Sequence, residues 1–155
     1  MRARRSVEGT AERFRVFPEK NGINAGAVVI LESTGGSVAE ALGMGRVIRQ
    51  MGFETEVSTY CFSACTLAFS GGVRRTVDVD AKFGVHRIST IALLESTQAF
   101  DLGQIAIAEL VEYSSFMGVD PNFVTPLTAV GPDEIKILSY DQLLKYRIVS
   151  TLAMT

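Results

Sequence analysis

The chain has 155 residues, of which 47% are hydrophobic and 21% charged, with a formal net charge of -2. This length and composition predict one globular domain with a hydrophobic core. Because the net charge is negative and basic residues gather only at the start of the chain, no nucleic-acid-binding face is expected.

The start of the chain carries the positive charge of a signal peptide, but residues 6–15 are polar and supply no apolar segment behind it. We therefore expect no signal peptide in this sequence. The apolar run at residues 27–31 stops at Glu32, well short of the roughly 20 residues that cross a bilayer, so no transmembrane segment is expected. Residues 1–26 are expected to be a peripheral segment, and residues 27–155 an α/β domain.

The first expected unit is a strand, a glycine turn and a helix. Residues 27–31 (AVVIL) are typical of a central strand buried on both faces of a parallel sheet. The adjacent Gly35 and Gly36 permit a tight turn. Ser37 has capping-box spacing to Glu40, which predicts a helix that starts at Val38 and ends before Gly52.

The remaining elements are shorter, with one exception. The longest helix is expected over residues 100–117, where apolar residues recur at helical spacing. Asp120 and Pro121 are typical of a helix start. We further expect strands at residues 54–59, 76–79, 82–85, 135–138 and 146–149, a buried helix at 63–70, an exposed loop at 87–96 and a capping box at 139–142.

The chemistry depends on one serine and the one histidine of the chain. A serine hydroxyl needs an imidazole base to become a nucleophile at neutral pH. His86 follows the expected strand at 82–85, and Ser63 starts the expected buried helix. Backbone N–H groups of Gly35, Gly36 and Ala64 are candidates for holding an oxyanion.

Three segments in this order resemble the Clp protease superfamily: STGGSV at residues 33–38, CFSAC at 61–65 and GVHR at 84–87. The segments are most similar to bacterial Clp-like serine peptidases that are predicted to be periplasmic or secreted. The resemblance covers roughly residues 27–149. Thr34 stands where that family usually has proline, and the residues around Ser63 differ from those of ATP-dependent Clp subunits, so partnership with an unfoldase is not expected.

The resemblance implies a Clp-protease/crotonase-like spiral of repeated β-β-α units. It implies a serine-type peptidase that needs neither cofactor nor ATP of its own, acts on peptides or unfolded proteins, and forms a homo-oligomer. The family's third catalytic residue corresponds best to Asp133, with Glu134 and Asp120 as alternatives. The relatives indicate a periplasmic or secreted location, while a cytoplasmic one stays open.

Cys61 and Cys65 are the only cysteines. With one histidine they cannot complete a four-ligand zinc site, so no metal site is expected. The pair is either reduced and packed as small apolar side chains, which we favour, or joined as a disulfide that holds the turn at Ser63. Cys65 is also a weaker candidate nucleophile.

Two other functions compete with a serine hydrolase. A crotonase-like acyl-CoA enzyme shares the implied fold and uses paired backbone amides without a serine–histidine pair. A catalytically inactive oligomeric scaffold would keep the fold and lose turnover. Labelling by a fluorophosphonate would favour the serine hydrolase, and binding of a CoA thioester would favour the acyl-CoA enzyme. A folded protein that does neither would favour the scaffold.

Overall fold

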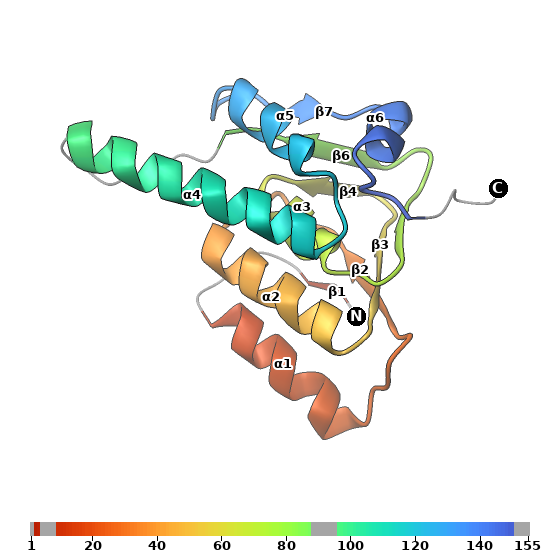
Figure 1. Cartoon of the computed structure of the whole chain (residues 1–155). Helices are drawn as coiled ribbons and strands as arrows, with labels where there is room; N and C mark the ends of the chain where they lie inside the picture. The colour runs from red at the N-terminus through yellow and green to blue at the C-terminus, as the bar shows by residue number, and fades with distance from the viewer. Residues whose placement is uncertain (1, 4–8, 88–95, 151–155) are drawn as a thin grey trace.

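The computed structural model describes residues 2–3, 9–87 and 96–150, whose strands form two small sheets (Figure 1). One sheet is entirely parallel, in the order β1-β2-β3-β5, and the other has the order β4-β6-β7 with β7 antiparallel. The strands are β1 (Arg2–Ala3), β2 (Val28–Leu31), β3 (Glu54–Val57), β4 (Tyr60–Phe62), β5 (Arg75–Val77), β6 (Lys82–Val85) and β7 (Lys136–Ile137). The chain is thus a mixed α/β single domain, as its pattern predicted.

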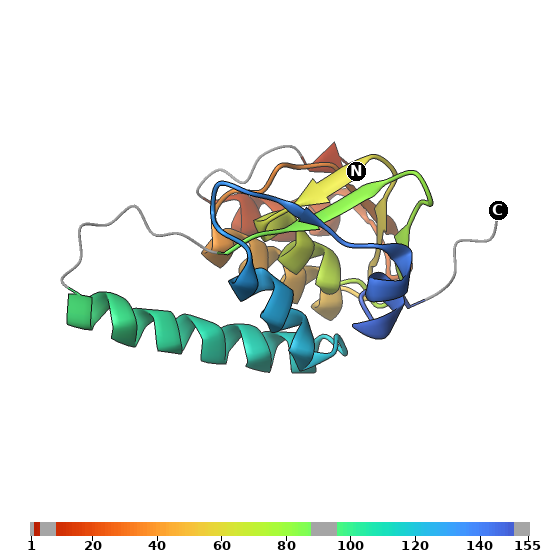
Figure 2. The same cartoon turned by 90° about the horizontal axis from the view of Figure 1, so that it is seen from above.

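Helices α2, α4 and α5 lie together on one side of the strands, and α3 lies between α4 and the strands (Figures 1 and 2). The helices are α1 (Thr10–Asn21), α2 (Val38–Gln50), α3 (Ala64–Ser70), α4 (Ser96–Phe116), the 3-10 turn η1 (Pro121–Phe123), α5 (Val124–Ala129) and α6 (Tyr140–Lys145). Every residue of α3 is buried, which confirms the expected buried helix. The first half of α4 extends beyond the other elements in both views.

Helix α2 begins and ends where the sequence predicted. The Ser37 side chain accepts a hydrogen bond from Glu40 N, and Gly52 follows with φ 68°. Glu40 itself does not complete a capping box. Its carboxylate instead accepts hydrogen bonds from Gly9 N (3.0 Å) and Ala11 N (2.8 Å), and so caps α1.

Helices α2 and α3 approach closely because glycines face each other. A Cβ on Gly71 would lie 2.2 Å from the carbonyl oxygen of Gly45, and one on Gly45 would lie 3.0 Å from the carbonyl oxygen of Leu67. The Tyr113 hydroxyl donates to that same Leu67 oxygen (2.6 Å), and burial raises the Tyr113 pKa. This packing fixes α3, and with it the position of its first residues.

Strand β2 occupies the expected central position but is covered fully on one face only. Val29 and Leu31 are 3% and 2% exposed, whereas Val28 is 40% exposed. Val29 and Leu31 belong to the same core as Phe14 of α1, a helix that lies in the segment expected to be peripheral and packs against α2. A run of apolar residues alone does not distinguish these two degrees of burial.

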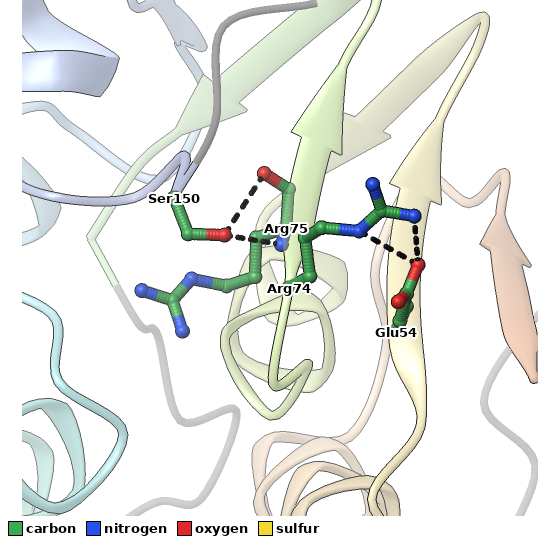
Figure 3. Close-up of polar contacts among 4 residues, drawn as sticks. All are labelled: Glu54, Arg74, Arg75 and Ser150. Carbon is green, nitrogen blue, oxygen red and sulfur yellow. Dashed lines mark hydrogen bonds and ion pairs between the residues drawn. The ribbon is translucent and has the colours of Figure 1, made fainter. Parts of the chain in front are cut away.

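One expected strand does not form, and one observed strand was not expected. Residues 146–149 form no strand: after α6 the chain runs to the edge of β5, where Ser150 N donates to Arg75 O (3.1 Å) and Arg75 N donates to Ser150 Oγ (2.7 Å) (Figure 3). The expected strand at 54–59 is present as β3, which ends at Val57; the chain then turns and enters the second sheet as β4, which the sequence did not predict. Of the expected loop at 87–96, residues 88–95 lie outside the described part.

Candidate active site

Ser63 lies at a sharp turn between β4 and α3. Its backbone has φ 56° and ψ -129°, a left-handed conformation that costs a non-glycine residue on the order of 1–3 kcal/mol. A serine at such a strand-to-helix turn is the arrangement that presents a nucleophile in α/β hydrolases. The conformation therefore distinguishes Ser63 from the other serines that the structure describes.

Backbone contacts hold this turn on both sides. Ser63 N donates to Gly84 O (2.9 Å), which fastens the turn to β6. The Ser63 carbonyl accepts from both Thr66 N (3.0 Å) and Thr66 Oγ1 (2.7 Å), which fastens it to α3. Sequence analysis did not select Thr66, since a threonine three residues after a turn is common in any helix start.

A disulfide bond joins Cys61 to Cys65 across the same turn. The favoured interpretation, two reduced cysteines packed in the core, is therefore wrong about their redox state. It is right about their burial. The bonded Cys65 has no thiol and cannot serve as a nucleophile in this state.

The glycine turn packs directly against Ser63. A Cβ on Gly35 would lie 2.7 Å from Ser63 Cβ and 3.2 Å from Ser63 Oγ, so no larger residue fits there unchanged. Gly35 and Gly36 have φ values of 113° and 142°, outside the range that other residues adopt readily. Gly35 N donates to Ser33 Oγ (3.1 Å), a contact that orients the turn beside the serine.

His86 follows the end of β6, the strand that pairs with β4. In this register Phe62 lies opposite Gly84, so His86 is placed just past the turn at Ser63. His86 Nδ1 lies 3.0 Å from the carbonyl oxygen of Arg87. Because a carbonyl only accepts, Nδ1 carries the proton in this contact, which in a neutral imidazole places the lone pair on Nε2.

The Arg87 carbonyl was not a candidate in the sequence, since a backbone atom carries no residue signature. It contacts the same ring nitrogen that a carboxylate contacts in a serine–histidine–aspartate triad. Within the described residues Ser63 Oγ and His86 make no hydrogen bond to each other. Such contacts commonly tighten only when substrate binds.

The candidate acids lie in two different places. Arg87 N donates to Val130 O (2.9 Å), and β7 pairs with β6. The loop that carries Asp133 and Glu134 connects these two contacts, so it lies beside His86 at the end of β6. Both acids are exposed. Asp120 instead accepts hydrogen bonds from Asn122 N and Nδ2 (both 2.9 Å), which lower its pKa and engage its carboxylate in the cap of η1.

A cavity of about 40 Å³ lies on the other side of the glycine turn. Its walls come from β2, α1, α2 and α3 and are mostly apolar; they include Leu31, Gly35, Met44, Ala64, Cys65 and Ala68. Within the described residues no three side chains of His, Cys, Asp or Glu gather closely enough to hold a metal ion. No helix in the same part of the chain has the length and apolar character needed to span a membrane.

No family model and no curated protein matches the chain in sequence. Among the solved structures that match its fold are two, each with a TM-score of 0.69 and 11% sequence identity over 99% of this chain and 96% of the other. One is described as an enzyme and the other as a peptidase from Plasmodium falciparum. The chain shares their fold. At this identity the likeness concerns the fold of the whole domain and not particular residues. The chain therefore has the same fold as a peptidase.

Proposed function

We propose that this chain is a serine hydrolase of the Clp-protease/crotonase superfamily that acts as a peptidase. The observation that supports the proposal is the strained turn at Ser63. The glycine turn packs against it, and the neighbouring strand β6 ends just before His86. A costly backbone conformation persists only where the surrounding structure holds it, and such conformations gather at functional sites. The fold shared with a peptidase agrees with this activity.

In the proposed mechanism Ser63 Oγ attacks the carbonyl carbon of the substrate and gives its proton to His86 Nε2. Backbone N–H groups of Ala64 and Gly36 receive the negative oxygen, and that of Gly35 joins them once it leaves Ser33 Oγ, to which it donates in the structure. The protonated His86 then gives the proton to the departing amine. A water molecule, deprotonated by His86, releases the acyl group from Ser63.

Asp133 is proposed as the carboxylate that stabilises the charged imidazole. It would take over the Nδ1 hydrogen bond that the Arg87 carbonyl accepts in the structure. The loop beside His86 carries both Asp133 and Glu134, whereas the Asp120 carboxylate caps η1. The proposal therefore keeps Asp133 first, with Glu134 as its alternative.

We further propose a homo-oligomer and a peptide or unfolded protein as substrate. Helix α4 supports the oligomer, because large apolar side chains along it are solvent-exposed in the single chain: Phe100 (67%), Ile105 (63%) and Phe116 (70%). The disulfide supports a periplasmic or secreted location, since such bonds persist in oxidising compartments.

Turnover of two substrate classes tests the proposed activity. We expect the oxidised chain to hydrolyse peptide amides or esters, and the variants Ser63→Ala and His86→Ala to lose at least about 1,000-fold in kcat/KM with the fold retained by circular dichroism. Turnover of a CoA thioester that survives Ser63→Ala would instead identify an acyl-CoA enzyme. A folded protein inert toward both classes would be a scaffold.

A further inference from the structure

The disulfide and the nucleophile occupy the same five residues. Cys61 is the middle residue of β4, Cys65 is the second residue of α3, and Ser63 stands midway between them. The bond therefore joins the strand before the turn to the helix after it. A covalent link across so short a segment restricts the backbone angles of the residue at its centre.

The backbone of Ser63 needs such a restriction. Its φ of 56° is one of two positive values among the non-glycine residues of the described part. The other contacts at the turn, to Gly84 and Thr66, fix its two ends separately. The disulfide adds a covalent link between the strand end and the helix start, and so restrains the angle through which the chain turns at Ser63.

We propose that Cys61 and Cys65 are positioning residues for Ser63, and that reduction of their bond switches the nucleophile off. This inference rests on the proposed serine hydrolase function. When the bond opens, Ser63 relaxes toward an ordinary backbone conformation and Oγ leaves the neighbourhood of the glycine turn. The chain would thus be active after it enters an oxidising compartment and inactive in a reducing one.

Cys65 is the more accessible end of the bond for a reductant. It lines the cavity beside the glycine turn and is 6% exposed, whereas Cys61 is completely buried. A thiolate of a small dithiol attacks Cys65 Sγ, forms a mixed disulfide there and expels Cys61 as a thiolate, which takes a proton from water. The second thiol of the reductant then displaces Cys65, so the dithiol supplies two electrons and leaves as its own cyclic disulfide.

The rate of fluorophosphonate labelling tests the switch. We expect dithiothreitol to lower the second-order rate constant of the folded protein about tenfold or more, and reoxidation to restore it. The double variant Cys61→Ser/Cys65→Ser should label slowly in both conditions. Equal rates before and after reduction would overturn the proposal, as would a reduced protein that loses its circular dichroism spectrum, because the bond would then support the whole fold.

Replacement of Ser63 by glycine tests the positioning without any activity. Glycine adopts positive φ freely, so Ser63→Gly relieves strain only where the disulfide enforces it. We expect the rise in melting temperature caused by Ser63→Gly to be about 3 °C larger in oxidised than in reduced protein. Equal changes would contradict the positioning role, whereas an oxidised wild-type protein that fails to label, with this difference present, would contradict only the hydrolase.

Discussion

Gly35 is the residue that shows most simply how tightly the site is built. A methyl group there would meet Ser63 Cβ at 2.7 Å, and the φ of 113° adds backbone strain. We expect Gly35→Ala to lower the rate of fluorophosphonate labelling about 100-fold, because a displacement near 1 Å at a reacting atom has an effect of that order. The measurement is the second-order labelling rate of folded protein.

Gly26→Ala is the matched control. Gly26 also has a positive φ, 83°, but a Cβ there would meet nothing within 4 Å. This variant should lose roughly 1 kcal/mol of stability and keep its labelling rate. If Gly26→Ala slowed labelling as much as Gly35→Ala, loss of stability rather than contact with Ser63 would explain both.

Substitutions of Asp133 and Glu134 test which carboxylate stabilises the charged His86 imidazole. We expect Asp133→Asn to lower kcat/KM roughly 100-fold to 10,000-fold, because the amide cannot stabilise the charged imidazole as a carboxylate does. Glu134→Gln removes an equal charge from the next residue and should have little effect. The reverse order would make Glu134 the acid, and unchanged activity in both variants would leave the Arg87 carbonyl as the only orienting group.

Sequence analysis selected the side chains of the proposed site but not the contacts that surround them. Ser63, His86 and the glycines could be selected because each chemistry requires those residue types in that order. The contact from His86 to the Arg87 carbonyl and the capping role of Asp120 are local contacts that depend on backbone conformation, which residue types alone do not specify. The bond between Cys61 and Cys65 could not be chosen either, since one spacing permits both redox states.

Among the elements, α1 depends on a single carboxylate of α2. Backbone N–H groups, first of Ala11 and then of Gly9, lower the pKa of Glu40. A lowered pKa means that the stabilisation is present above the unfolded value of about 4.5 and is lost as the pH falls through the folded pKa. We expect Glu40→Gln to reduce the change in melting temperature between about pH 6 and pH 3.

Glu112→Gln is the control for Glu40→Gln, since it removes the same charge from the exposed face of α4. It should leave the acid dependence of the melting temperature almost unchanged. A similar effect from both variants would show that net charge, rather than the cap of α1, sets the acid dependence.

Local signals located the helices well and the strands less well. The Ser139 capping box is confirmed, because its two hydrogen bonds involve only residues 139 and 142. Strand β4 was missed because its short run follows β3 almost directly, and only its pairing with β6 separates the two. Val149 is buried without a strand, since its apolar character reports burial and not backbone pairing.

At the scale of the whole molecule, Arg75 ties distant segments together. Its guanidinium donates to carbonyl oxygens of Gly72, Met117, Arg147 and Ile148 at 2.7–3.1 Å, and burial lowers its pKa to about 10. It therefore remains charged near neutral pH. We expect Arg75→Met to lower the free energy of unfolding by roughly 3–5 kcal/mol in urea titrations, because the carbonyls of Arg147 and Ile148 lose this donor while those of Gly72 and Met117 keep the donor of Arg49.

The neighbouring Arg74 is the control. Its side chain is 57% exposed and pairs with Glu54 on the adjacent strand, as Figure 3 shows. Arg74→Met removes the same charge and should change the unfolding midpoint only slightly, because exposed ion pairs contribute little. Equal losses in the two variants would contradict the role assigned to the buried guanidinium.

The site of a fluorophosphonate adduct tests the central claim most directly. Oxidised protein is labelled to completion, digested and mapped by mass spectrometry, with His86→Ala labelled in parallel. The account requires one adduct, on Ser63, whose formation is at least about 100-fold slower in His86→Ala. An adduct on another residue, no adduct on folded protein, or a rate that does not depend on His86 would contradict it.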